Sequence, residues 1–512
     1  MIFHVLQPKA AVPSSGVDTV YLQIDHWNDY SFVTMFQVHI FDENGTSHML
    51  PNVKIGFVGQ TAETHTYAQL GASFAFLPDG FFSLGTDVEY YEKLFRDFSA
   101  VWREKYLTCL KDVVGDTTVL SQAVNEQVFQ TSHLRSVRIK TVEDQFVRVL
   151  RGEVVLTNFN FGFDLPASDT FAGFDLAFSV AASSTPSTNI HALIGRNGVG
   201  KTTLLNSMVK AIANSSDKVA VFYTDHALIG RQAIGGDFFS SLISIAYSAF
   251  DPFDLPKENE DAQSATQYSY IGLTDYTGTD GAIIKSKDVM YDEFFESLKF
   301  CLSESNRKSR WMQAVSTLGS DGNFSEMGLL DLAELFDDEL KKEAYKKVRK
   351  MSSGHAIVIL TITQLVAKVE EKTLVLFDEP ESHLHPPLLS ALMRSLSQLL
   401  HNRNAIAIVA THSPVVLQEI PRSCVWKVFR ERLSSSWSRP DTETFGENVG
   451  TLTREVFGLE VVKSGFHTVL AELVSAGGTY EHILTELGDN LGFEAKGILK
   501  AMVVNRDAGF PR

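Results

Sequence analysis

Residues 190–205 read IHALIGRNGVGKTTLL and carry the strongest local signal in the chain. The first five residues form a short, mostly apolar run that suits a buried strand, and a helical pattern begins near Thr203. Between them, glycines let the backbone curl so that its N–H groups converge, and the start of the helix adds a partial positive charge at the same point. A strand, a glycine-rich turn and a helix in this order predict a cradle for phosphate groups.

The complete GxxxxGKT pattern gives the residues of this turn distinct roles. Lys201 is expected to reach the β- and γ-phosphates of a nucleotide, and the Thr202 hydroxyl is expected to coordinate Mg²⁺. The pattern therefore predicts ATP and Mg²⁺ as cofactors. The residues expected to bind ATP here are Gly195, Arg196, Asn197, Gly198, Val199, Gly200, Lys201, Thr202 and Thr203.

Two further apolar runs, residues 373–377 and 405–410, also read as buried strands. Asp378 follows the first run and is expected to hold Mg²⁺ together with Thr202, while Glu379 positions or deprotonates the attacking water. His412 follows the second run and is expected to contact the γ-phosphate and hold the glutamate, because an imidazole both donates and accepts hydrogen bonds. Glu379 and His412 are thus the predicted catalytic residues.

Upstream of the acidic strand, a charged helix over 331–350 places its acids early and its bases late, in agreement with its dipole. It leads to the turn MSSGH at residues 351–355. The basic residues of 341–350 favour a solvated face with pairs such as Glu343 with Lys347. Contact with nucleic acid at this face is the minor alternative.

Taken in order, these motifs resemble the ABC ATPase superfamily, with Walker A at 195–202, the signature at 351–355, Walker B at 374–379 and the switch histidine His412. More narrowly, the blocks SSGH, DEPESHLHP and THSP are similar to the soluble, non-transporter branch. That branch includes the overcoming-lysogenization-type (AAA_21) ATPases and the PtuA ATPases of Septu anti-phage systems. The resemblance covers residues 189–421.

The resemblance implies a homodimer, or a larger assembly built from it, with ATP at the interface. ATP would lie between the Walker A of one chain and the signature of the other, and the turn 382–385 would also face the partner chain. The signature residues that would bind ATP in trans are Ser352, Ser353 and Gly354.

Two departures from the family pattern stand out. The signature reads MSSGH where many members have LSGGQ, which leaves the contact of His355 open. No glutamine-containing loop follows the first strands, and residues 248–253 are the best positional substitute. Phe159 and Phe161 lie in a region suited to stacking on adenine.

The predicted fold class is α/β, an ABC-type P-loop ATPase head with a β-rich N-terminal region and a helical insertion. In the N-terminal region, alternation at 36–40 predicts a strand, and a helix is expected over 88–114 with Thr86 and Glu89 as its capping box. The expected divisions are a β-rich and helical region that either stands alone or joins the head (1–150), the Walker A lobe (151–254), a mostly helical insertion (255–350), the lobe with signature, Walker B and switch histidine (351–432), and a loop and helical tail (433–512).

Composition sets the outer limits of the function. Hydrophobic residues at 44% and charged residues at 21% are typical of globular proteins, and a net charge of −17 argues against general binding of nucleic acid. No apolar run approaches the ~20 residues of a membrane helix, and the first residues lack the pattern of a signal peptide. We therefore expect a cytoplasmic protein without a membrane partner. The three widely spaced cysteines suggest inert thiols.

The leading hypothesis is a dimeric ATPase that acts as sensor or regulator of a bacterial anti-phage defence complex with a separate nuclease, of the HNH type found in Septu systems. The residues after His412 lack the Glu plus Asp-x-Asp constellation of a nuclease. The alternative is a RecF-like DNA-repair ATPase that binds DNA directly across its dimer. A transporter subunit is disfavoured by the insertion and the β-rich start.

Overall fold

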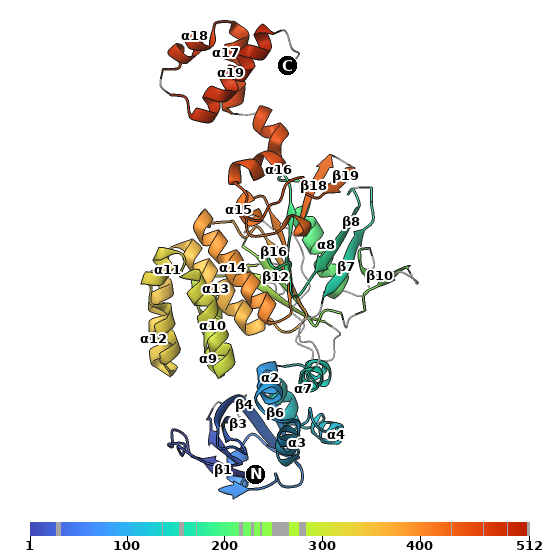
Figure 1. The fold of residues 1–512 in the computed structure, drawn as a ribbon, viewed down its shortest axis with the longest axis vertical. Helices are drawn as coiled ribbons and strands as arrows, with labels where there is room; N and C mark the ends of the chain where they lie inside the picture. Colours follow the sequence, from blue (N-terminus) through green and yellow to red (C-terminus); the bar gives the residue numbers. More distant parts are fainter. Residues whose placement is uncertain are drawn as a thin grey trace.

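The computed structural model describes residues 1–26, 32–135, 137–152, 158–169, 171–213, 219–226, 230–235, 238–247, 266–275, 283–431, 433–463, 465–488 and 490–508. Figure 1 shows the β-rich N-terminal region at one end, the ATPase head in the middle and a group of C-terminal helices at the other end.

A six-stranded sheet forms the N-terminal region. Its strands lie in the order β5-β1-β2-β3-β4-β6. β1 and β2 are parallel, and all other neighbours are antiparallel. Alternate residues of β2 and β3 are buried, in agreement with the alternation predicted near 36–40. The strands are β1 (Ile2–Leu6), β2 (Thr19–Ile24), β3 (Met35–Phe41), β4 (Ser47–Phe57), β5 (Ser73–Phe74) and β6 (Phe81–Gly85).

The prediction of a single helix over 88–114 is wrong, because the structure has two helices there, α2 (Val88–Asp97) and α3 (Ala100–Cys109). Phe98 and Ser99 are extended between them, and the Ser99 side chain caps α3 by accepting a hydrogen bond from the backbone N–H of Trp102. The predicted capping box is also wrong. Asp87 is the N-cap residue of α2, and its side chain makes no capping hydrogen bond.

The buried apolar side chains of this region, from Phe3 to Val149, form a hydrophobic cluster of their own. The short helices that complete it are α4 (Thr117–Ala123), α5 (Gln127–Thr131) and α7 (Val147–Leu150). Whether residues 1–150 stand alone or join the head stays a prediction.

Buried ion pairs tie the N-terminal region to the rest of the chain. Asp87 lies 2.8 Å from Arg310 and 3.0 Å from Arg403, and its side chain is 3% exposed. Burial alone would raise the pKa of Asp87, but the charges of the two arginines outweigh it and hold the pKa below its ordinary value. Because breaking one partner of a buried pair leaves an uncompensated charge, this contact fixes the region against the head.

The head is built on a seven-stranded sheet with the order β13-β12-β16-β17-β9-β18-β19. Only the last pair is antiparallel. A second, antiparallel sheet has the order β11-β10-β7-β8. The strands are β7 (Phe159–Leu165), β8 (Phe174–Val180), β9 (Ile190–Ile194), β10 (Val221–His226), β11 (Gly230–Ala233), β12 (Ser241–Ala246), β13 (Gln267–Gly272), β16 (Thr373–Asp378), β17 (Ile406–Thr411), β18 (Val425–Glu431) and β19 (Ser434–Ser438).

Both faces of the parallel sheet are covered. In β16, Val375 and Phe377 join a core with the long helices α9 (Lys287–Leu302), α10 (Ser305–Leu318), α13 (Ser353–Lys368) and α14 (Pro386–Asn402). Leu374 and Leu376 point the other way, into a core shared with α8 (Lys201–Ala213) and the antiparallel sheet. Because successive side chains of a strand alternate between faces, a wholly apolar run marks a strand covered on both sides.

The range expected as a mostly helical insertion also contributes to the sheet, since β13 pairs with β12 in parallel. Its helical part is α9 and α10, followed by α11 (Gly322–Glu326), a 3₁₀ turn at Leu329–Glu334 and α12 (Asp337–Arg349). The charged helix expected from 331 therefore begins six residues later. Within α12 Glu343 pairs with Lys346 at 2.8 Å, and the expected pairing with Lys347 is not the one formed.

The range 433–512, expected to be a loop and helical tail, begins with strand β19. Beyond it lie α16 (Val449–Lys463), α17 (Phe466–Ala476), α18 (Tyr480–Glu486) and α19 (Phe493–Asp507). The last three helices share a small core around Leu470, Ile483 and Leu499, and Figure 1 shows them set apart from the head. In the described part of the chain, no helix combines the length and the apolar character needed to cross a membrane.

Candidate nucleotide site

The turn after β9 has the backbone that a phosphate cradle requires. Gly198 and Gly200 have φ angles of 81° and 98°, a region that glycine adopts without strain. A Cβ atom at Gly198 would meet nothing within 4 Å, so the turn is open where a ligand would approach. α8 begins at Lys201, which places its N-terminus at the same point.

Lys201 is held by this turn. Its Nζ donates hydrogen bonds to the carbonyl oxygens of Gly195 at 3.0 Å and Arg196 at 3.1 Å. Burial lowers the pKa of the ammonium group, and the charges of Glu379, Asp378 and Glu381 oppose that effect. The lysine and the acidic strand therefore meet at one edge of the sheet.

Glu379 leaves the tip of β16 through a left-handed backbone conformation. Its φ angle is 46°, which costs a non-glycine residue ~1–3 kcal/mol, and its N–H donates to the carbonyl oxygen of Ala410 at 2.9 Å. This turn separates Glu379 from the strand whose last residue is Asp378. The two adjacent acidic residues thus have different backbone conformations.

His412 lies between two carboxylates. Its Nδ1 is 3.0 Å from Oε1 of Glu381 and 3.7 Å from Oε1 of Glu379. The interaction with Glu379 raises the pKa of His412, against a lowering by burial, and Glu381 adds to the increase. Conversely, His412 lowers the pKa of Glu379. The pair therefore favours an ionised glutamate next to a protonated imidazole.

Glu381 was missed by the sequence reasoning. Its side chain is 8% exposed, and its Oε1 accepts hydrogen bonds from the Thr411 hydroxyl at 2.7 Å and the His412 backbone N–H at 2.6 Å. Glu381 thereby fixes the segment that carries the histidine. The third acid of the DEPE block was the available signal, because a buried carboxylate needs donors of this kind.

Phe159 and Phe161, considered for adenine stacking, are 5% and 4% exposed and belong to the hydrophobic core beneath the antiparallel sheet. The expectation for these two residues is wrong. Phe171, in the turn between β7 and β8, lies beside the cradle instead: a Cβ atom at Gly200 would be 2.7 Å from its ring. The Arg430 guanidinium is 4.6 Å from the centre of that ring. An aromatic residue in an otherwise polar loop was the only sequence signal.

The signature opens α13. Ser352 is the N-cap residue, and its Oγ accepts from the backbone N–H of His355 at 3.4 Å. Gly354 is buried, and a Cβ atom there would be 2.6 Å from the carbonyl oxygen of His383. Ser352 and Ser353 are exposed. The signature therefore packs against the turn after Walker B of its own chain and presents its serines to solvent.

An ABC-type fold implies ATP and Mg²⁺, and the residues present fit both. The open turn at Gly198 and the ammonium group of Lys201 suit phosphates, and the hydroxyl of Thr202 and the carboxylate of Asp378 are oxygen ligands of the kind that Mg²⁺ prefers. The substitute proposed for the glutamine loop, residues 248–253, lies outside the described residues.

Residues 213–418 match the family described as "AAA domain, putative AbiEii toxin, Type IV TA system". Over 524 aligned residues the chain is also 45% identical to protein ea59 of Escherichia phage lambda, and the alignment covers 99% of both proteins. The chain belongs to the ea59 family. Its matched AAA domain and its phosphate loop make this ea59-family protein an ABC-class P-loop ATPase in fold.

Solved structures with some likeness to this ea59-family chain include MJ1267, an ATP-binding cassette of an ABC transporter, in its ADP conformation. That match has a TM-score of 0.30 and 13% identity, and covers 60% of this chain and 98% of MJ1267. UvrA2 from Deinococcus radiodurans matches with a TM-score of 0.31 and 16% identity, over 61% of this chain and 42% of UvrA2. The strand order and the phosphate loop, rather than these low scores, define the fold.

Proposed function

We propose that this protein binds ATP with Mg²⁺ and hydrolyses it. The observation that carries the proposal is the meeting of Lys201, Asp378, Glu379 and His412 at the carboxyl ends of β9, β16 and β17, three adjacent parallel strands. Crevices beyond the carboxyl ends of parallel strands are where α/β sheets bind ligands.

The residues divide the work by their chemistry. The N–H groups of the turn and the Lys201 ammonium bind the phosphates, and Thr202 and Asp378 hold the cation. When bound, Mg²⁺ neutralises phosphate charge. Glu379 accepts the proton of the attacking water, and His412, oriented by Glu381, keeps the glutamate in place.

The second part of the proposal is a head-to-tail dimer in which Ser352, Ser353 and Gly354 of one chain close over the ATP held by the other chain. The exposure of both serines supports it, and of the two hydroxyls that of Ser352 also contacts Nδ1 of His355 at 2.6 Å within its own chain. The buried Gly354 would act through its backbone, since its Cα faces His383 at close range.

The third part concerns the biological role. We propose that the dimer acts as the sensor or regulator of an anti-phage defence complex, in which the nuclease is a separate chain of the HNH type. The likeness of the motif blocks to Septu-type ATPases supports this role. The tail offers α17–α19 as a binding element, since Phe466 and Phe493 are 47% and 96% exposed on it.

The basic face of α12 gives little support to a direct DNA-binding role of the RecF kind. Among the bases of α12, Lys346 pairs with Glu343, Arg349 pairs with Asp288 at 3.2 Å, and Lys347 donates to the carbonyl oxygens of Met327 and Gly328. These partners neutralise or occupy much of the basic face, and the net charge of −17 repels a polyanion.

Phosphate release by purified protein, with and without Mg²⁺, tests the activity. Isolation of the native complex from phage-exposed and unexposed cells tests the role, because co-purification of an HNH protein is expected. Recovery of DNA without a nuclease partner would instead support the RecF-like reading.

A further inference from the structure

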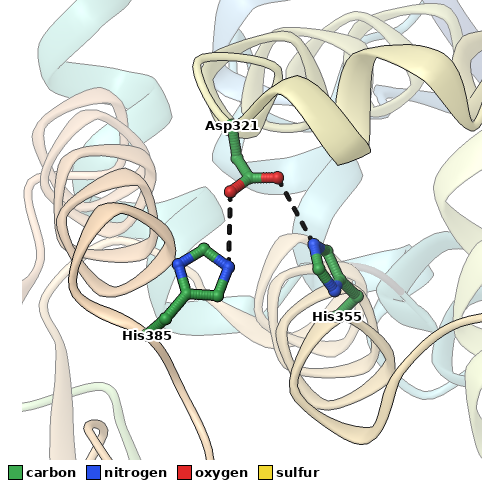
Figure 2. A group of neighbouring side chains, drawn as sticks. All are labelled: Asp321, His355 and His385. Atoms are coloured by element: carbon green, nitrogen blue, oxygen red, sulfur yellow. Dashed lines mark hydrogen bonds and ion pairs between the residues drawn. The ribbon is translucent and has the colours of Figure 1, made fainter.

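Three side chains from separate parts of the chain meet behind the signature (Figure 2). Asp321 lies between α10 and α11, His355 lies in the first turn of α13, and His385 is the N-cap residue of α14. One ligand atom of each residue lies within 4.8 Å of the others. We propose that these three residues form a binding site for a divalent transition-metal ion of the zinc class.

The distances are long for a hydrogen bond and an ion pair, and they also suit ligand atoms that surround one ion. Nε2 of His355 is 3.3 Å from Oδ1 of Asp321, and Nε2 of His385 is 3.5 Å from Oδ2. Both exceed the ~2.7–3.2 Å of an ordinary N–H···O bond. Two ligands in a tetrahedral zinc site, each ~2.0–2.2 Å from the ion, lie about 3.3–3.5 Å apart.

The surroundings orient the ligands as a metal site requires. Nδ1 of His355 lies 2.6 Å from Oγ of Ser352. In the tautomer whose Nδ1 donates to this oxygen, the Nε2 lone pair is directed at Asp321. Asp321 is itself fixed by the backbone N–H groups of Asn323 and Phe324. The ring of Phe324 packs 5.1 Å from that of His355 and covers one side.

Asp321 and His355 are 6% and 8% exposed, whereas His385 is 46% exposed. Two ligands are therefore enclosed by the chain, and the third reaches the site from a half-exposed position. Nδ1 of His385 also accepts a long capping contact of 3.4 Å from the Leu388 N–H. Three protein ligands leave a fourth position of a tetrahedral ion for water or another group.

The ligand set also selects the class of ion. Imidazole nitrogens suit zinc and its neighbours in the first transition series, whereas Mg²⁺ prefers oxygen ligands. Excess Mg²⁺ should therefore fill the oxygen-rich nucleotide site and leave this one to Zn²⁺. A bound ion would join the signature helix α13 to the start of α14, the element that follows Walker B.

The test uses the full chain, stripped of metal with a chelator and titrated with Zn²⁺ in excess Mg²⁺ without nucleotide. The wild-type chain should retain one equivalent of Zn²⁺ after desalting, and Co²⁺ in its place should give the intense visible bands of tetrahedral coordination. His385→Ala, at a half-exposed position, should lower the Zn²⁺ affinity by more than about 100-fold, beyond the 10–100-fold cost of losing an outer-shell partner.

His401→Ala removes an exposed histidine from the other end of α14 and should bind Zn²⁺ like the wild type. Zn²⁺ should also raise the thermal unfolding temperature of the wild type and of His401→Ala, but not of His385→Ala. No stoichiometric Zn²⁺ on the wild type, or equal affinity in His385→Ala, would overturn the proposal. Since nucleotide is absent, neither result bears on the proposed ATPase activity.

Discussion

The two halves of the proposed composite site differ in what their residues face. At the edge of the sheet, Lys201 and His412 lie close enough to Glu379 for its charge to raise the pKa of both, against a lowering by burial. At the start of α13, Gly354 and His355 are buried against their own chain, whereas Ser352 and Ser353 are exposed. In the proposed function, the first half binds the phosphates within one chain, and the second half closes over a nucleotide held by another chain.

The strongest way to break this comparison is to remove the phosphate-binding cation. Lys201→Ala should lower ATP turnover on the order of 10³-fold or more, because a preorganised charge at the phosphates is lost. Phosphate release measures ATP turnover, and calorimetric titration with ATP measures ATP affinity. Lys210→Ala, on the last turn of the same helix, is the matched control and should behave as wild type. Unchanged ATP affinity in Lys201→Ala would refute the role of the cradle.

A second change separates binding from chemistry at the same edge. Glu379→Gln should keep ATP affinity and lower turnover by about 10²–10⁴-fold, because the amide cannot take the proton of water. The variant should accumulate as an ATP-bound dimer in light scattering. Glu381→Gln keeps an acceptor oxygen for Thr411 and should have a smaller effect on turnover. A Glu379→Gln chain with wild-type turnover contradicts the assignment.

The smallest expected effect is the pH dependence of the His412 pair, measured without Mg²⁺ or nucleotide. Because the folded pKa of His412 is raised above 6.5, its stabilisation is complete below pH 6.5 and is lost as the pH rises through the folded pKa. Because the folded pKa of Glu379 is lowered, the stabilisation that it contributes is complete above pH 4.5 and is lost as the pH falls through the folded pKa. Both side chains are more than a third exposed, so the effect should stay below about 1 kcal/mol.

Denaturant unfolding of wild type and His412→Ala at several pH values measures this contribution. The difference in unfolding free energy between the two proteins should be largest near pH 5–6 and should shrink towards pH 9. A difference that does not change with pH would show that the imidazole acts here without its charge.

Local patterns were enough to predict the parts of the site that lie next to strands. The glycine-rich turn follows the apolar strand β9, and the acidic residues Asp378 and Glu379 stand at the end of the apolar strand β16. The sequence alone therefore locates them. Glu381 and Phe171 carried weak local signals, but the proposed roles of these two residues and of Asp321 come from contacts with distant segments. The break at Ser99 was missed because a continuous apolar stripe runs through it, although a serine cap was present.

The structure also changes how to test the closure of one chain's signature over the ATP bound by the other chain. A side chain at Gly354 would meet the carbonyl oxygen of His383 in its own chain, so a substitution there disturbs the fold before it meets a partner. Ser353 is exposed in the first turn of α13, where a carboxylate is favourable for the helix. Ser353→Asp therefore places a negative charge against a nucleotide bound by the other chain without threatening folding.

Mixing Lys201→Ala chains with Ser353→Asp chains tests the composite site most directly. Each variant alone should be inactive, and each should be confirmed as folded, with exchange of chains verified by tags. A mixed dimer has one site with both lesions and one with neither, so the account predicts that ATPase activity returns on mixing, up to the share expected for one intact site per mixed dimer. No recovery in a mixture with verified mixed dimers, or full activity of Ser353→Asp alone, would contradict it.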